Sequence, residues 1–302
     1  MPAGSTAIAH LEEGRLFYRG EPAARLAAER SLEQVASLLW TGSFDADIFD
    51  TQLHAVAGGA GSDGLSFIHR AQSMLPVVAA RDFFADDLQR EAAAATGWRI
   101  LNLLASIAAD SPELEDTVEM TLARAWARKP ESAAASVRSA LILCAATSAK
   151  DHAADAAGCA AAAGASPWSA ATAALATMSS ERCAGALVRA LTMFDALEES
   201  DDPAALVADF VRAGIFGETV PSDAGDTAEG LIELLPRSAR RTFVMSVLDA
   251  AAEEGAKAPL PFALAAFVRT LALPDEAAVA LFSIGRTIGC VAHAIEMYDE
   301  RK

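Results

Sequence analysis

The sequence has few basic residues for its length. Its 302 residues include 24 Lys and Arg against 41 Asp and Glu, which gives a formal net charge of −17 at pH 7. Nucleic-acid binding requires a basic face that neutralises phosphates, so this composition argues against a nucleic-acid partner. It also argues against a polyanionic ligand, unless a local basic pocket is present.

The cysteine patterns typical of disulfide frameworks and zinc sites are also missing. The four cysteines are Cys144, Cys159, Cys183 and Cys290, which form no CxxC pair and have no regular spacing. Free thiols in a reducing cytoplasm are the simplest interpretation, and neither a metal nor a cofactor is implied.

No targeting or membrane-spanning segment is evident. Residues 1–10 lack a basic region followed by an apolar stretch, so a signal peptide is not expected. The longest weakly polar stretch, residues 153–178, is mostly Ala and is interrupted by polar residues and Pro167. Ala contributes too little transfer free energy to span a bilayer. The sequence therefore predicts a cytoplasmic protein with closely packed internal helices and no membrane partner.

Helix-forming residues dominate the rest of the composition. Hydrophobic residues make up 53% of the chain, much of it Ala. Residues 6–9 and 15–18 are short β-prone runs around Glu12-Glu13-Gly14 and predict a hairpin. Ser31 is a good N-cap for a helix that ends near Gly42. Further helices are predicted over 65–75, 88–108, 112–126, 133–148, 151–163, 167–178, 184–197, 201–211, 238–254, 261–271 and 275–298.

Three groups of residues could carry chemistry on local evidence. Asp151, His152 and Asp155 could bind a metal, because the His and the second Asp have helical i, i+3 spacing. An exposed helix start produces the same pattern, and that interpretation is favoured here. Cys144 and Cys183 are thiols in apolar helical contexts. A catalytic thiol needs a nearby base or cation, and the sequence offers none, so buried structural thiols are favoured.

The third group lies in the longest predicted loop, residues 214–230, which contains four Gly and Pro221. Its acidic side chains could bind a divalent ion, but their spacing does not match an EF-hand loop. A solvated surface loop is therefore the favoured interpretation. The acidic residues concerned are Glu218, Asp223, Asp226 and Glu229.

Motifs at both ends of the chain resemble those of bacterial citrate and 2-methylcitrate synthases. Residues 13–20 have the glycine-turn hairpin ending in Tyr18-Arg19-Gly20, and residues 31–42 have the helix ending in Leu-Leu-Trp-Thr-Gly. Residues 280–296 are similar to that family's last long helix. Between them Leu141-Ile142-Leu143, Gly185-Ala186, Phe216-Gly217, Gly225-Asp226 and Phe262-Ala263-Leu264 occur in the family's order.

The resemblance implies an all-α, citrate synthase-like two-domain helical fold with a short N-terminal β-hairpin. It implies a large dimerisation domain, residues 1–182 plus 272–302, and a small domain, residues 183–271. It also implies a homodimer built mainly from large-domain helices, with the active site in the cleft between the domains. The family condenses an acyl-CoA with a 2-oxo acid.

This sequence has different residues at most of the positions that carry this chemistry in the family. Cys183 stands where the family has the His that stabilises the enol, and Glu218 where it has the His that polarises the ketone. Pro261 stands where it has the carboxylate base. The substrate-binding His after Leu-Ile-Leu is replaced by Cys144. In the family's Gly-Asp-Pro-Arg motif, Asp226 is kept but Ala228 replaces the carboxylate-binding Arg.

These departures predict that ordinary citrate synthesis is lost. Removing one catalytic acid, base or oxyanion donor costs about 100-fold or more in rate. No His occurs between His152 and His293, which excludes both small-domain His roles without any alignment. The sequence also stops before the family's basic tail, which contributes arginines to substrate and CoA binding.

Two hypotheses of function remain open. One is a pseudoenzyme that acts as a partner or regulator of an active citrate synthase paralogue, or as a small-ligand binder. The partner would be a second copy or that paralogue, and the candidate ligands are an acyl-CoA or a small carboxylic acid. The other hypothesis is a repurposed acyl-CoA-handling transferase that uses Cys183 or Glu218 with a non-standard acceptor.

Overall fold

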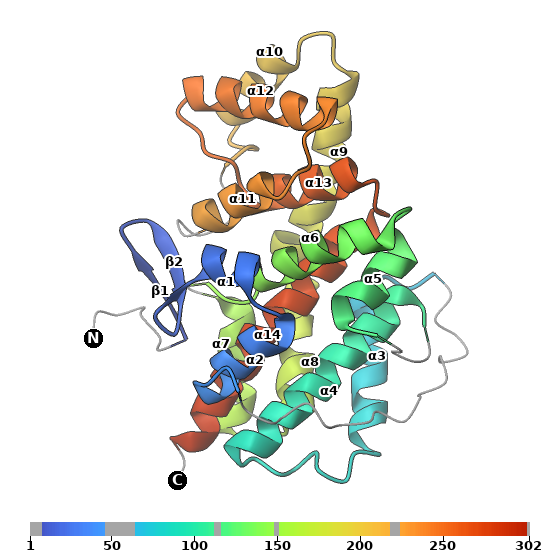
Figure 1. Cartoon of the computed structure of the whole chain (residues 1–302), viewed down its shortest axis with the longest axis vertical. Coiled ribbons are helices and arrows are strands. Elements are labelled where there is room, and N and C mark those ends of the chain that lie inside the picture. Colours follow the sequence, from blue (N-terminus) through green and yellow to red (C-terminus); the bar gives the residue numbers. More distant parts are fainter. Residues whose placement is uncertain (1–7, 46–63, 112–115, 148–150, 218–223, 301–302) are drawn as a thin grey trace.

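The computed structural model describes residues 8–45, 64–111, 116–147, 151–217 and 224–300. Within these ranges the chain forms fourteen α-helices, one π-helical turn and a small sheet, so the predicted all-α fold is confirmed (Figure 1). The helices are α1 (Ala23–Glu29), α2 (Leu32–Thr41), α3 (Phe67–Ala79), α4 (Arg90–Ala109), α5 (Val118–Trp126), α6 (Pro130–Leu143), α7 (His152–Ala162), α8 (Pro167–Met178), the π-helical turn η1 (Glu181–Gly185), α9 (Ala186–Glu199), α10 (Pro203–Arg212), α11 (Ala224–Glu233), α12 (Ala239–Glu253), α13 (Leu260–Leu271) and α14 (Glu276–Asp299).

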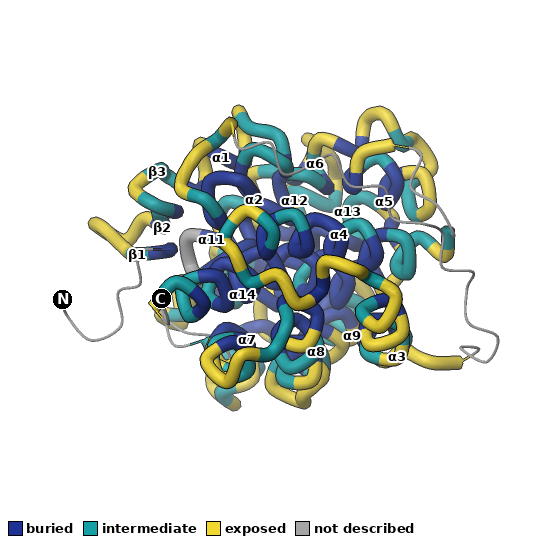
Figure 2. The backbone as a smooth tube through the Cα atoms, turned by 90° about the horizontal axis from the view of Figure 1, so that it is seen from below, coloured by how far each residue is buried: buried dark blue, intermediate teal, exposed yellow. Residues whose placement is uncertain are grey.

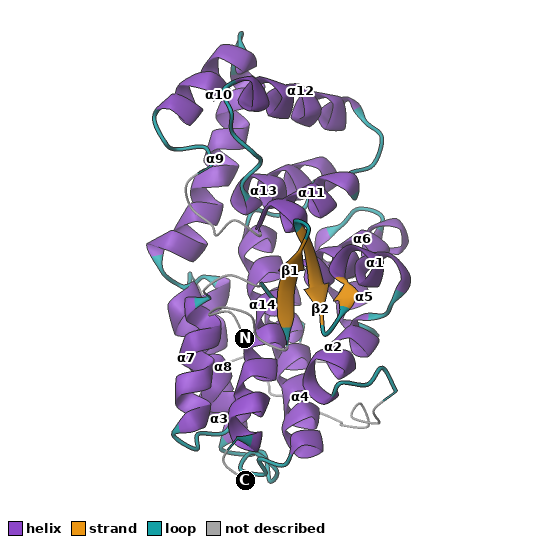
Figure 3. Ribbon diagram, turned by 90° about the vertical axis from the view of Figure 1, so that its left-hand side faces the viewer, coloured by secondary structure: helices purple, strands orange, loops and turns teal. Residues whose placement is uncertain are grey.

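The predicted N-terminal hairpin is present, but its first strand covers residues 9–12 rather than 6–9, and it has a third strand that the sequence did not indicate. Strands β1 (Ala9–Glu12), β2 (Arg15–Tyr18) and β3 (Glu21–Pro22) pair antiparallel in that order. Glu12 pairs with Arg15, so the turn consists of Glu13 and Gly14, both with positive φ. Such a turn matches the twist of the flanking strands and favours Gly at its second position. The sheet lies against one side of the helical body, beside α1 (Figure 3).

Helix α2 begins and ends as its sequence predicts. The Ser31 hydroxyl accepts a hydrogen bond from the amide of Gln34, and the Gln34 side chain accepts one from the amide of Ser31. This reciprocal capping box satisfies two amides that the first helical turn leaves unpaired. Gly42 ends the helix in the left-handed conformation, with φ of 83°.

Helix α14 is the centre of the core. Helices α2, α4, α6, α7 and α8 all pack against it, and almost its whole length is buried (Figure 2). The indole of Trp40 in α2 donates a hydrogen bond to the carbonyl of Ile288 at 2.9 Å. Gly97 in α4 allows Trp40 and Val291 to approach its backbone, because a side chain there would overlap both. The two ends of the chain are therefore packed together.

Two helices in the described part of the chain are long and apolar enough to cross a membrane by length and composition, namely α4 and α14. In their most apolar windows, 67% and 89% of the residues are buried inside the fold. Core helices pass the same length and composition test, and this degree of burial is what a core helix requires. We therefore interpret both as core helices.

Helices α10 to α13 lie together at one end of the molecule, and α9 extends to them from the larger group of helices (Figure 1). Aromatic rings pack this end: Phe194 and Phe262 have ring centroids 5.8 Å apart, and Phe216 and Phe262 have centroids 5.1 Å apart. These helices all fall within residues 183–271. The exact division into a large and a small domain remains a prediction.

The prediction of an uninterrupted loop over residues 214–230 is wrong for its last part. Residues 224–233 form α11, although Gly225 and Gly230 weaken helix propensity. Burial explains the helix, because Thr227, Ala228 and Leu231 all pack inward. Gly230 lies against the side chain of Leu143, and a Cβ added to Gly230 would lie 3.1 Å from the nearest Leu143 carbon. Tertiary packing has therefore overridden the local glycine signal.

Candidate functional site

The end of α6 is the part of the structure where the predicted substrate-binding position Cys144 lies. Cys144 caps α6 and is fully buried. The buried Tyr18 hydroxyl lies within hydrogen-bond distance of three backbone carbonyls of this turn, those of Ile142, Leu143 and Ala146. It also accepts a hydrogen bond from the Ala146 amide at 3.2 Å. The hairpin thus holds the end of α6 in place.

Helix α14 passes against the same turn at the closest distance that a backbone allows. A Cβ on Gly285 would lie 2.6 Å from the Leu141 carbonyl oxygen and 2.8 Å from the Cβ of Cys144. A Cβ on Gly289 would lie 2.3 Å from the carbonyl oxygen of Ala145, which accepts a hydrogen bond from the Gly289 amide. Only glycine fits at these positions without a shift of the backbone. This close approach places Arg286 beside Cys144.

Arg286 is a buried cation, with 6% of its surface exposed. Its Nη1 donates to Oδ2 of Asp151 at 2.9 Å, while its Nε is buried and has no hydrogen-bond partner among the described residues. The other carboxylate oxygen of Asp151 accepts from the amides of Ala153 and Ala154 at the start of α7. Asp151 is therefore both a helix cap and the counterion of Arg286.

The protonation of this cluster follows from burial and from the ion pair. Burial raises the pKa of the Cys144 thiol to about 12, against a smaller opposing effect of Arg286. Burial also works against the charge of Asp151, but Arg286 and the cap amides outweigh it, so the Asp151 pKa lies below its usual value. At neutral pH Cys144 is thus an uncharged thiol, which is a weak nucleophile.

Helix α11 packs over the end of α6 and brings a further predicted position to this place. Ala228 is fully buried, and the Thr227 hydroxyl donates to the carbonyl of Leu143 at 3.5 Å. Ala228 has no group that could bind a carboxylate. The side chain of Asp226 lies outside the described residues, as do Glu218 and Asp223. Glu229 lies on the exposed side of α11.

Pro261 and the segment that follows Cys183 border a second place, between α9 and α13. A small pocket of about 30 Å³ is lined by Pro261 with Pro259 and Phe262, by Ala186 and Arg189 just after η1, and by Ile215. Cys183 lies in η1 and is half-buried, whereas Pro261 is buried in the first turn of α13. The pocket is therefore bordered by the segment after Cys183, the segment around Pro261 and the segment that precedes Glu218. Its volume is about that of one water molecule, far below the several hundred Å³ of ligand sites.

The predicted metal group at the start of α7 is divided by the fold. Asp151 points inward to Arg286, while His152 and Asp155 are exposed, with 3.9 Å between Nδ1 of His152 and Oδ2 of Asp155. Among the described residues, no three His, Cys, Asp or Glu side chains come together in a way that could hold a metal. The favoured interpretation of an exposed helix start fits His152 and Asp155, but not Asp151.

Sequence reasoning missed the Arg286–Asp151 pair. The signal was present, because Arg286 is the one charged residue between Ile284 and Ile288 in an otherwise apolar, glycine-containing stretch. A charged residue at a buried helix position requires a counterion. Its partner is 135 residues away in the chain, so local patterns could not identify it.

This helical fold, with its sheet of N-terminal strands and its long central C-terminal helix, is that of the citrate synthases. The family model of the citrate synthase C-terminal domain matches residues 1–221. The chain belongs to the citrate synthase family. No curated protein matches its sequence.

Solved citrate synthases share the fold at low sequence identity. The citrate synthase of Pyrobaculum aerophilum is 15% identical with a TM-score of 0.77, over 99% of this chain and 87% of that one. That of Thermotoga maritima MSB8 is 19% identical with a TM-score of 0.70, over 97% and 88%. That of Thermoplasma acidophilum, solved as a ternary complex with carboxymethyl coenzyme A and oxaloacetate, is 16% identical with a TM-score of 0.72, over 98% and 90%.

Proposed function

We propose that this chain is a citrate synthase-like pseudoenzyme, without condensing activity, that acts as a partner or regulator of an active paralogue or as a small-ligand binder. The observation that carries the proposal is the buried pair of Arg286 with Asp151 beside Cys144. A guanidinium that could bind a substrate carboxylate is already paired with a carboxylate of the chain itself. A dicarboxylate would have to displace Asp151 and leave it unpaired.

Among the described positions, Pro261, Ala228 and Cys144 supply neither a base nor a charged donor for the condensation. Proton abstraction requires a base, and the Pro261 side chain has no lone pair to accept a proton. Polarising a carbonyl requires a hydrogen-bond donor or a cation, and Ala228 offers neither. Cys144 is an uncharged thiol in a fully buried position. The loss of several groups together is consistent with selection for the scaffold alone.

The partner in this proposal is a second copy of the chain or an intact citrate synthase paralogue. The carboxymethyl coenzyme A in the Thermoplasma acidophilum complex makes an acyl-CoA the first ligand to test, followed by small carboxylic acids. Co-expression of the tagged chain with a paralogue from the same genome tests the partner. Copurification in a fixed ratio, together with a change in the paralogue's rate, is the expected result.

A thiol-release assay tests the lost activity. Purified protein is incubated with oxaloacetate and either acetyl-CoA or propionyl-CoA, with an intact citrate synthase as the positive control. We expect no release above the rate without protein. Turnover that scales with protein concentration would overturn the proposal.

One observation favours the alternative of a repurposed acyl-CoA-handling transferase. Cys183 is half-buried and lies in a π-helical turn, whereas Cys144 and Cys290 are fully buried and Cys159 is exposed on the regular helix α7. Single π-helical turns occur frequently at functional sites. Acyl transfer to Cys183 from an acyl-CoA, with release of the CoA thiol, is the reaction that this alternative requires. Mass spectrometry of the intact protein after incubation with acetyl-CoA detects it.

A further inference from the structure

A pocket lies between α9 and the starts of α3 and α14. Its volume is about 360 Å³, within the range of small-molecule sites. One wall is formed by η1, α9 and the end of α13, which fall within the predicted small domain. The other wall is formed by the starts of α3 and α14, which fall within the predicted large domain. A molecule in this pocket would contact both groups of helices.

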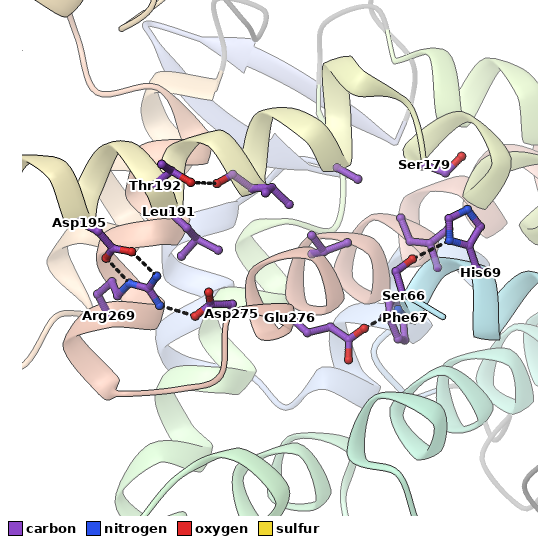
Figure 4. A pocket seen from close by; sticks show the side chains of 14 residues that line it. Ser66, Phe67, His69, Ser179, Leu191, Thr192, Asp195, Arg269, Asp275 and Glu276 are labelled. Atoms are coloured by element: carbon purple, nitrogen blue, oxygen red, sulfur yellow. Dashed lines mark hydrogen bonds and ion pairs between the residues drawn. The ribbon is translucent and has the colours of Figure 1, made fainter. Parts of the chain in front are cut away.

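The middle of the pocket is apolar. Leu191 of α9, Phe67 of α3 and Val279 of α14 form its floor and are nearly inaccessible, at 4%, 0% and 9% exposed. Val188, one helical turn before Leu191, is 55% exposed at the edge of the pocket. Figure 4 shows this apolar middle with polar groups at both ends. The pocket can therefore cover an apolar ring or chain, with polar groups of the ligand directed to its ends.

At one end Arg269 is already paired with two carboxylates. Its Nε and Nη2 each donate to the Asp195 carboxylate at 2.7 Å, and its Nη1 donates to Asp275 at 2.5 Å. Two carboxylates thus surround one guanidinium, so this end has an excess negative charge. The side chain of Asp275 is 72% exposed and open to a ligand. Electrostatic attraction here favours a cation and disfavours a carboxylate.

The opposite end is close to neutral. Glu276 accepts from the amide of Phe67 at 2.5 Å and from Nη2 of Arg70 at 2.8 Å. His69 and Ser66 are hydrogen bonded to each other through Nδ1 and the hydroxyl, at 2.8 Å. This end adds polar contacts without a second strong charge. The difference between the ends orients an amphipathic ligand with its cationic group toward Asp275.

We infer that this pocket binds a small amine with an apolar body, with the ammonium group at Asp195 and Asp275 and the apolar body against Val188, over the floor that Leu191 and Val279 form. Because α9 and α14 form opposite walls, the bound amine holds the two groups of helices in one relative position. The inference is independent of whether the chain condenses acyl-CoA, since no residue of this pocket is a predicted catalytic position.

Three matched probes test the charge preference. Tryptamine, tryptophol and 3-indolepropionate have the same ring and a similar two-carbon arm, but carry an ammonium, a hydroxyl and a carboxylate. Isothermal titration at low salt, supported by saturation-transfer NMR, gives their dissociation constants. We expect tryptamine to bind about tenfold more tightly than 3-indolepropionate, with tryptophol between them. Equal binding of the amine and the acid would overturn the inference.

Substitutions in and outside the pocket test whether tryptamine binds there. Val188→Arg places a cation at its edge and is expected to weaken tryptamine binding at least fivefold. Met245→Arg, at a similarly exposed position of α12 outside the pocket, is the matched control and should bind as the wild type does. Asp275→Asn should weaken tryptamine about threefold and leave tryptophol unchanged, a difference that a loss of folding would not produce.

Two results would contradict the inference. One is undiminished tryptamine binding by Val188→Arg. The other is a sedimentation experiment in which Val188→Arg turns a dimer into a monomer while Met245→Arg does not, because the pocket would then be covered by a second copy of the chain.

Discussion

The contact of α6 with α14 and the contact of α9 with α13 differ in what the chain has kept. At the first, Gly285 and Gly289 allow backbone contact, Tyr18 binds the end of α6, and Arg286 has a counterion. At the second, the residues that the family resemblance aligns with catalytic positions are a half-buried thiol, Cys183, and a buried proline, Pro261, which lines a small pocket. The packing that maintains the fold is therefore in place at the first contact, while Pro261 at the second contact offers no group that could accept a proton. Packing and chemistry impose separate requirements on the same fold.

Removing the counterion of Arg286 should have the largest effect on stability. Asp151→Ala leaves a buried guanidinium unpaired and removes the N-cap of α7. We expect the free energy of unfolding to fall by about 3 kcal/mol or more. Urea denaturation followed by circular dichroism measures the change. Asp155→Ala, four residues along the same helix and exposed, should change it by less than about 0.5 kcal/mol.

The same variant tests whether the position next to Cys144 can bind an external carboxylate. Formate at about 0.1 M should restore part of the stability of Asp151→Ala, because ligands that bind only the folded state stabilise it. It should not stabilise the wild type or Asp155→Ala. If formate stabilises all three proteins equally, Arg286 is not accessible to an added anion and the pair is purely structural.

Disrupting the glycine contact of α14 with α6 should have the next largest effect on stability. Gly289→Ala places a Cβ 2.3 Å from a backbone oxygen, so the helices must move apart. Overpacking of this kind costs about 2 kcal/mol. Gly158→Ala in α7 is the matched control, since its Cβ would meet only the Met297 side chain at 3.7 Å. Helix propensity then predicts stabilisation by up to about 1 kcal/mol. A similar loss in both variants would show that the close contact is not the cause.

Lowering the pH should reduce the stability of the region around α14 before that of the other regions. Burial lowers the pKa of His293, which also faces Asp151, Asp155, Arg286 and Arg19. A lowered folded-state pKa means that the unfolded chain takes up the proton first. Stability should therefore fall as the pH drops below about 6.5, at no more than about 1.4 kcal/mol per pH unit. Asp151 adds a further loss below about pH 4 for the same reason. His293→Gln should flatten the first decrease, as measured by urea unfolding at pH 7 and pH 5.5.

Much of the fold could be predicted because its signals are local. The Ser31 cap, the Gly42 stop and the bounds of α8 are fixed by short-range hydrogen bonds and by Pro at the first helical position. Helix α11 could not be predicted in this way. Its glycines indicate a loop, and only its burial against the end of α6 makes it a helix.

The candidate site was predictable only in part. The resemblance to the citrate synthase motifs indicated Cys144, Cys183, Ala228 and Pro261, and their roles remain predictions. The pairing of Arg286 with Asp151 depends on residues from two distant helices, and no spacing in the sequence encodes that contact. The pocket between α3, α9 and α14 was missed for the same reason, because its walls come from separate segments.

The smallest effect should come from Cys183, which the family resemblance aligns with a catalytic His. Cys183→Ser replaces a half-buried thiol by a hydroxyl that water can reach, so the free energy of unfolding should change by less than about 0.5 kcal/mol. Cys144→Ser is the matched comparison. It places a hydroxyl at a fully buried position and should cost about 1–3 kcal/mol if it finds no hydrogen-bond acceptor. The pseudoenzyme proposal further requires that neither variant changes the products formed with acetyl-CoA. An acetyl adduct on the wild type that disappears in Cys183→Ser would instead assign a thiol acyl-transfer function to η1.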